Sequence, residues 1–186
     1  APKHSHELAL KRIGRYLKNT ADRGMIIKPI RDPDMLNIDA FPDADFAGMY
    51  GHEKPTDPAC AKSCTGFLIT VYDCTMVWVS KLQTETETAL STMEAEVNTL
   101  AHCCRELFPV IDIVSEIGKA VGLETDDMAT MHVSIHEDNV GALTLGRLEP
   151  RRMTPRSKHY AIKYHWFCDY IGPHNVELIK IATANQ

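Results

Sequence analysis

Carboxylates recur in three short segments of this 186-residue chain, each at the end of an expected structural element. The first segment holds Asp43 and Asp45, the second Glu94 and Glu96, and the third Asp138. Magnesium and other hard divalent cations prefer clustered carboxylate oxygens. An α/β sheet is able to bring three such segments to one place. These residues therefore suggest metal-dependent chemistry, although their spacing alone does not show that they meet.

The elements expected to position these acids are strands and helices in alternation. Strand patterns are predicted over residues 35–41, 65–72, 75–79, 130–136 and 176–181, the second and third forming a hairpin. Helical patterns are predicted over residues 6–18, 89–118, 139–145 and 157–170, with Pro109 expected to kink or restart the second helix. This order predicts one α/β domain with a mixed sheet of about five strands, helices on both faces and a preceding N-terminal basic helix.

Composition fits one globular domain, and the distribution of charge suggests its partner. Apolar residues make up 44% and charged residues 24%, which excludes a disordered or collagen-like chain. The net charge of −5 argues, as a total, against a nucleic-acid partner. Segments 1–31 and 147–163 are nevertheless basic (+6 and +5), whereas residues 32–146 carry −15. The pattern suits a phosphate-contacting rim around a carboxylate-rich centre.

Two further classes are excluded. The longest weakly charged run, residues 63–80, is too short and too polar to cross a bilayer, so no membrane partner is expected. The six cysteines lack the paired spacing of zinc sites, and no secretory segment precedes them. They are expected to be reduced thiols.

Several sequence blocks together resemble the ribonuclease H domain of copia-type LTR retrotransposon polyproteins. Residues 42–48 (PDADFAG) resemble the family's SDADWAG, and residues 89–96 (ALSTMEAE) resemble its ALSSTEAEY. Residues 136–139 (HEDN) resemble its CDNQSA segment. The blocks RSKH and IKYH at 156–165 resemble its RSKHI and KYH. The blocks occur in the family's order along nearly the whole chain, so the joint match is specific.

The resemblance implies a ribonuclease H-like fold and an endoribonuclease that cuts the RNA strand of RNA/DNA hybrids during reverse transcription. The family's ligand positions fall on Asp43, one of the two glutamates in residues 94–96, and Asp138. The implied reaction is two-metal-ion phosphodiester hydrolysis with two Mg²⁺ ions, for which Mn²⁺ is a substitute.

Helical geometry does not choose between the two glutamates. At 100° per residue, Glu94 and Glu96 flank the apolar stripe of the helix by about 80° on opposite sides, so they do not both point into one site. The resemblance favours Glu96, because Glu96 followed by Val97 fits the family's glutamate–apolar run. Glu94 and Asp45 are the second choices for metal ligands.

Substrate contacts are expected from basic and amide side chains. The candidates are Arg151, Arg152, Arg156 and Lys158 for phosphates, and Gln83 and Asn139 for hydrogen bonds in the minor groove. The resemblance also implies a connection helix from an upstream reverse transcriptase over residues 1–30, and a ribonuclease H-like domain over residues 31–186. The expected location is the retrotransposon's virus-like particle in the cytoplasm.

Departures from the family pattern keep alternatives open. The family's fourth carboxylate follows a stretch resembling residues 181–186, so the domain is expected to be truncated and to bind a second ion weakly, with Asp169 as an unsupported substitute. Glu137 beside Asp138 also departs from the pattern, and strand alternation suggests that it faces the surface. The alternatives are an inactive nucleic-acid-binding or connection module and, disfavoured because Glu96 precedes Asp138, an integrase-type core.

Overall fold

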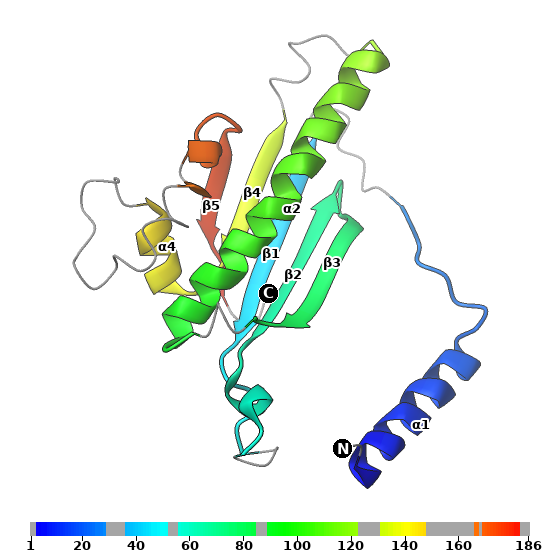
Figure 1. Cartoon of the computed structure of the whole chain (residues 1–186). Helices are drawn as coiled ribbons and strands as arrows, with labels where there is room; N and C mark the ends of the chain where they lie inside the picture. The colour runs from blue at the N-terminus through cyan, green and yellow to red at the C-terminus, as the bar shows by residue number, and fades with distance from the viewer. Residues whose placement is uncertain are drawn as a thin grey trace.

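A computed structural model describes residues 3–28, 36–51, 56–84, 89–122, 131–147, 166–167 and 169–182. Its centre is a five-stranded sheet in the order β3-β2-β1-β4-β5 (Figure 1). The strands are β1 (Asn37–Asp45), β2 (Cys64–Val71), β3 (Cys74–Leu82), β4 (His132–Glu137) and β5 (Val176–Lys180). β1, β2 and β3 pair antiparallel, whereas β4 pairs parallel with β1 and with β5. The predicted mixed sheet is confirmed.

The predicted hairpin of β2 and β3 is also present. Its turn residues Tyr72 and Asp73 have positive φ angles of 50° and 58°, the conformation that a tight two-residue hairpin needs. Ile38, near the start of β1, pairs with Val71 beside this turn, whereas Asp45 at the end of β1 pairs with Cys64. The hairpin turn therefore lies at the opposite end of the sheet from Asp43 and Asp45.

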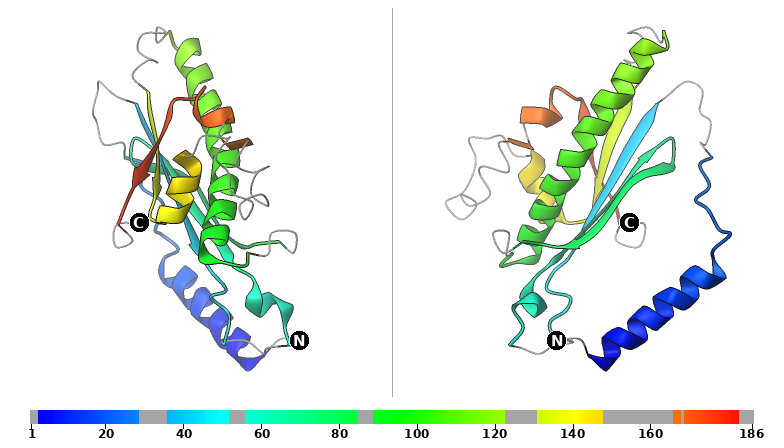
Figure 2. Two further views of the ribbon diagram at one scale, coloured as in Figure 1. Left: turned by 90° about the vertical axis from the view of Figure 1, so that its left-hand side faces the viewer. Right: turned by 45° about the vertical axis from the view of Figure 1, so that its right-hand side comes forward.

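Two helices pack on the sheet. α2 (Thr92–Ala120) contacts β1 and β2, and α4 (Val140–Arg147) contacts β5, β4 and α2. Both lie on the same face of the sheet (Figure 2). Within the described residues the opposite face is not covered by a helix, so the expected second layer remains a prediction for the rest of the chain. α2 runs through Pro109 as one continuous helix, so the predicted restart does not occur. The carbonyl of Arg105 loses its helical partner at Pro109, and both residues are exposed.

The core fills the space between α2 and the sheet. Alternate residues of the strands face the helix and are buried, among them Ile38, Ala40, Ile69, Val133 and Ile135. α2 contributes Leu100, Cys103, Cys104, Leu107, Phe108 and Ile111 to the same cluster. Burying one such large side chain contributes about 1.5–3 kcal/mol, so this layer fixes α2 on the sheet.

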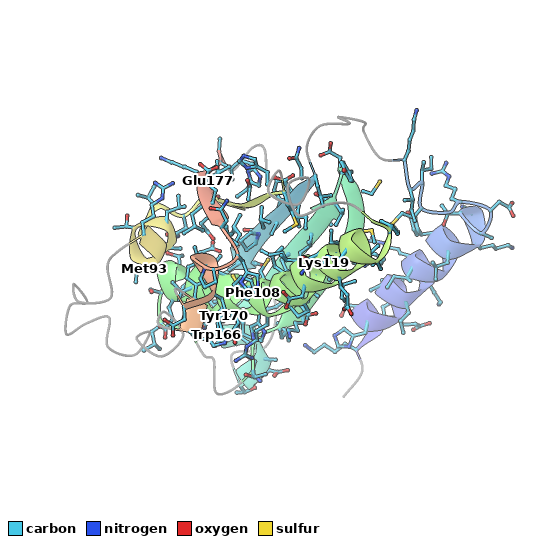
Figure 3. The ribbon with its side chains drawn as sticks, turned by 90° about the horizontal axis from the view of Figure 1, so that it is seen from above. Met93, Phe108, Lys119, Trp166, Tyr170 and Glu177 are labelled. Carbon is cyan, nitrogen blue, oxygen red and sulfur yellow. The ribbon has the colours of Figure 1, made fainter. Side chains whose placement is uncertain are left out.

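A short helical segment packs on α2 near its middle. The part of the predicted 157–170 helix that the structure describes, residues 166–167 and 169–170, is helical, and the rest lies outside the described residues. Phe108 stacks on Tyr170 with ring centroids 5.1 Å apart, and Trp166 lies 5.7 Å from Phe108 (Figure 3).

The N-terminal helix α1 (His4–Asn19) stands apart from this core. None of its residues is buried, and it lies clear of the sheet in Figure 1. No described helix is long and apolar enough to cross a membrane. The five described cysteines, Cys60, Cys64, Cys74, Cys103 and Cys104, are free thiols, as expected, and Cys168 lies outside the described residues.

Candidate metal centre

The acidic segments meet because of how β1 and β4 pair. The two strands are parallel neighbours, with Asn37 opposite His132 and Ala40 opposite Ile135. Their carboxyl ends therefore point to the same edge of the sheet. β1 continues to Asp45 beyond this pairing, bonded there to β2. Pro42 lies beyond the register in which β1 pairs with β4, Asn37–Ala40 with His132–Ile135, and opposite Phe67 of β2.

Four carboxylates gather at this edge. One carboxylate oxygen from each of Glu96, Glu137 and Asp138 lies within 4.8 Å of the other two. Asp43 stands beside this trio and interacts electrostatically with Asp138 and Glu96. Glu96 and Glu137 are buried, Asp138 is half-buried and Asp43 is exposed. The cluster thus has a buried floor and an open side on which a large substrate could lie.

Burial and mutual repulsion make the charged form of these acids costly. Desolvation, followed by the charges of Asp43 and Asp138, raises the pKa of Glu96 to about 8. Desolvation likewise raises the pKa of Glu137 to about 8, with Glu96 adding repulsion. The pKa of Asp43 is raised by desolvation and by Asp138. A bound cation would remove both penalties.

The structure separates the two glutamates that helical geometry left equivalent. Glu96 faces the cluster: one of its oxygens lies within 4.8 Å of oxygens of Glu137 and Asp138, and the charges of Asp43 and Asp138 raise its pKa. Glu94 belongs to the cap of α2: its backbone N–H donates to Ser91 Oγ (3.2 Å), and its Oε2 accepts from the backbone N–H of Leu90 (2.7 Å). Glu96, and not Glu94, therefore lies with Asp43 and Asp138.

Glu137 contradicts the expectation that it faces the surface. Its side chain is 0% exposed. Alternation along β4 does turn it away from its neighbours in sequence, but it places Glu137 on the same face as Val133 and Ile135, which belong to the core shared with α2 and α4. The strand alternation was predicted correctly, but Glu137 was assigned to the wrong face of the sheet. A clue in the sequence was that Glu137 continues the apolar positions of this strand.

The turn after β4 is fixed by backbone contacts. The backbone N–H of Asn139 donates to Glu137 Oε1 (3.0 Å). Asn139 Oδ1 accepts from the backbone N–H groups of Gly141 (2.9 Å) and Ala142 (3.1 Å), which makes Asn139 the N-cap of α4. A Cβ atom at Gly141 would stand 2.9 Å from Met93 Cγ, so glycine permits the close approach of α4 to the first turn of α2. This packing holds Asp138 near Glu96.

Gln83, a predicted substrate contact, is part of the interior. It is 2% exposed, and its Nε2 donates to Thr65 Oγ1 (3.2 Å), Thr99 Oγ1 (3.4 Å) and the carbonyl of Ala95 (3.1 Å). Its Oε1 accepts from Asn98 Nδ2 (3.3 Å). The side chain of Gln83 thus joins the end of β3 to α2 beside Glu96, and its predicted contact with nucleic acid stays a prediction.

The remaining candidates lie elsewhere. Asp45 is exposed, and its carboxylate lies over Gly48, where a Cβ atom would stand 1.9 Å from Asp45 Oδ2. Asp169 is exposed in the segment that packs on Phe108, about 18 Å along α2 from Glu96, so it does not join the cluster. The predicted phosphate contacts Arg151, Arg152, Arg156 and Lys158 lie outside the described residues.

The cluster suits a hard divalent cation. All its donors are carboxylate oxygens, the ligands that Mg²⁺ and Mn²⁺ prefer. Within the described part of the chain, Glu96 Oε2 and Glu137 Oε2 are buried without a hydrogen-bond partner. Buried oxygens of this kind are costly unless a proton or a cation satisfies them. Asp43, Glu96, Glu137 and Asp138 are thus the residues able to hold such an ion.

Comparisons with known proteins agree with the resemblance noted in the sequence. No family model matches. The chain is 28% identical over 185 residues to the retrovirus-related Pol polyprotein from transposon RE1 of Arabidopsis thaliana, covering all of this chain and 11% of that protein. It is also 28% identical over 182 residues to the Pol polyprotein from transposon TNT 1-94 of Nicotiana tabacum, covering 98% and 12%. The chain is homologous to these polyproteins and spans about a tenth of their length.

Solved structures similar to the chain include ribonucleases H. One is LC11 ribonuclease H1, isolated from compost (16% identity, TM-score 0.45, 81% of this chain and 88% of that chain). Another is ribonuclease H1 of Halobacterium salinarum (11% identity, TM-score 0.39, 80% and 88%). A third is the protease-reverse transcriptase of prototype foamy virus (10% identity, TM-score 0.49, 86% and 19%).

Proposed function

We propose that this chain, a homologue of part of the retrovirus-related Pol polyproteins of plant transposons, is a ribonuclease H that cuts the RNA strand of RNA/DNA hybrids during reverse transcription of a copia-type element. The observation that carries the proposal is the meeting of Asp43, Glu96 and Asp138 at the carboxyl edge of β1 and β4. These three carboxylates are far apart in the sequence, and the fold brings them to one place.

Asp43, Glu96 and Asp138 would hold two Mg²⁺ ions, or Mn²⁺ in their place. Divalent ions bound there supply electrostatic stabilisation of a phosphodiester and activation of water for its hydrolysis. The carboxylates serve as ligands and not as nucleophiles. Asp43 and Asp138, on the open side, would face the scissile phosphate, whereas Glu96 would bind from the buried side. Gln83 acts as a positioning residue, because its bond to the carbonyl of Ala95 holds the turn of α2 that carries Glu96.

The basic segment 147–163 is proposed to grip phosphates without reading sequence, through Arg151, Arg152, Arg156 and Lys158. Asn139 remains a proposed contact to the substrate through its amide nitrogen, since its oxygen caps α4.

The proposed location is the element's virus-like particle in the cytoplasm.

The N-terminal helix is proposed to connect this domain to an upstream reverse transcriptase. We assign residues 1–30 to the connection and residues 31–186 to the ribonuclease H-like domain. α1 exposes Leu10 (68%), Tyr16 (67%) and Leu17 (61%), a set of side chains that a partner surface would cover. In a chain that includes the reverse transcriptase, the amides of α1 should exchange hydrogen more slowly than in the isolated chain; equal exchange would contradict the assignment.

The function is tested by offering the chain three substrates with Mg²⁺ or Mn²⁺: an RNA/DNA hybrid, duplex DNA and duplex RNA. A ribonuclease H cuts only the RNA strand of the hybrid. Strand transfer on duplex DNA would favour an integrase-type core. Binding of the hybrid without cleavage, in a chain extended at its C-terminus as well, would favour a connection module and overturn the proposal.

A further inference from the structure

We propose that Glu137 is a further ligand of the divalent cation at this edge of the sheet, coordinating it through Oε2 from the buried floor of the cluster. The inference rests on the proposed function, since it concerns the same metal centre. It adds a residue that sequence reasoning assigned to the surface.

The position of Glu137 carries the first part of the argument. Its side chain is 0% exposed, and one of its oxygens lies within 4.8 Å of oxygens of both Glu96 and Asp138. Two ligands on opposite sides of one Mg²⁺ ion stand about 4.1 Å apart. Three ligands cannot all be opposite one another, and adjacent ligands stand about 2.9 Å apart, so the three oxygens would draw together by up to about 2 Å to share one ion.

The hydrogen bonds of Glu137 carry the second part. Oε1 accepts from the backbone N–H of Asn139 (3.0 Å), which fixes the orientation of the carboxylate. Oε2 is buried and has no hydrogen-bond partner among the described residues. Glu96 Oε2, reaching the cluster from α2, is in the same state. Glu96 and Glu137 belong to one cluster, come from different elements and each have an orphaned oxygen, which a shared cation would satisfy.

The end of β4 explains how two consecutive acids serve one site. Within a strand, neighbouring side chains point to opposite faces. β4 ends at Glu137, and the backbone N–H of Asn139 turns back to Glu137 Oε1. Asp138 is therefore freed from the alternation and reaches the cluster from the open side, while Glu137 enters it from the face that α2 covers.

The test compares Mn²⁺ affinity, measured from the loss of the free-ion EPR signal, in wild type, Glu137→Gln and Glu177→Gln. Glutamine keeps the shape of the side chain and an oxygen that accepts from Asn139 N–H, but it lacks the charged Oε2. Glu177 is a matched control, because it is an exposed strand glutamate on β5 (Figure 3). We expect Glu137→Gln to weaken Mn²⁺ binding at least about tenfold and Glu177→Gln to leave it unchanged.

The outcomes separate this inference from the proposed function. If wild type binds Mn²⁺ and cuts the hybrid, but Glu137→Gln binds Mn²⁺ as tightly, the inference is wrong and the function stands. If wild type neither binds Mn²⁺ nor cuts, both fall. Should Glu137→Gln misfold by circular dichroism, a Mn²⁺-soaked crystal of wild type decides. An anomalous peak within about 2.5 Å of Glu137 Oε2 supports the inference, and its absence there overturns it.

Discussion

Glu96 on α2 and Glu137 at the end of β4 bring carboxylate oxygens within 4.8 Å of each other in the interior, and each keeps one oxygen without a hydrogen-bond partner among the described residues. The fold therefore keeps two glutamates close together in the interior, where their negative charges would repel and where neither is well hydrated. Such an arrangement is unfavourable unless protons or a cation compensate for it, so the metal-free protein should respond strongly to pH and to divalent ions.

The first prediction concerns pH. The pKa of Glu96 and of Glu137 is about 8 in the folded protein, against 4.5 for an ordinary glutamate. Between these values the folded state binds more protons than the unfolded state, so the free energy of unfolding falls as the pH rises from about 4.5 to about 8. The slope is up to about 1.4 kcal/mol per pH unit for each carboxyl.

Urea unfolding in EDTA at pH 5.5 and pH 8 measures this effect. We expect greater stability at pH 5.5, a smaller difference when Mn²⁺ is present, and a flatter profile for the double variant Glu96→Gln/Glu137→Gln. The exposed control Glu177→Gln should keep the wild-type slope. Equal stability of the wild type at the two pH values would show that these acids are not strained by burial.

The second prediction concerns the role of Gln83. Gln83→Ala removes the amide that bonds Thr65, Thr99 and the carbonyl of Ala95, and it leaves buried polar groups unpaired. The expected loss is about 1–3 kcal/mol in the free energy of unfolding, measured by urea titration. Lys81→Ala, an exposed change two residues earlier, should cost less than about 0.5 kcal/mol. A stable Gln83→Ala that bound the hybrid weakly would support Gln83 as a substrate contact.

The third prediction separates the two glutamates of α2. Glu94→Gln weakens the cap at the start of the helix and should cost about 0.5–1 kcal/mol in stability while Mn²⁺ affinity is preserved. Glu96→Gln should do the reverse: it relieves a buried charge in the metal-free protein and lowers Mn²⁺ affinity at least about tenfold. Calorimetric titration with Mn²⁺ checks both variants. Loss of affinity in Glu94→Gln alone would exchange the two roles.

Hydrophobic periodicity predicted the strands, the hairpin and the long helix, because each has one face turned to a single core. The strand that ends at Asp45 extends beyond its predicted end at residue 41, because its pairing with β2 continues through Pro42 to Asp45. Pro109 suggested a break, and an exposed helical face tolerates it.

The site was harder to predict, because its details depend on which face each element presents. Periodicity located Glu94 and Glu96 on either flank of α2, but only the cap formed with Ser91 and the position of α2 on β1 distinguish them. Alternation likewise shows which residues of the strand share a face with Glu137, but it does not show whether that face is buried. The burial of Gln83 follows from the hydrogen bonds that tie the residue after β3 to β2 and α2, which no local pattern encodes.

The most direct test of the central claim compares cleavage of a hybrid, labelled in its RNA strand, by wild type, Asp43→Asn and Asp73→Asn in Mg²⁺. Asp73 is an exposed turn residue at the far end of the sheet, and asparagine tolerates its positive φ. We predict RNA-strand cleavage by wild type and Asp73→Asn, and at least about a 100-fold loss in Asp43→Asn with its fold and stability retained. Full activity of Asp43→Asn, or no cleavage in Mg²⁺ or Mn²⁺ by a wild-type chain extended at its C-terminus, would contradict the assignment of this edge as a ribonuclease H centre.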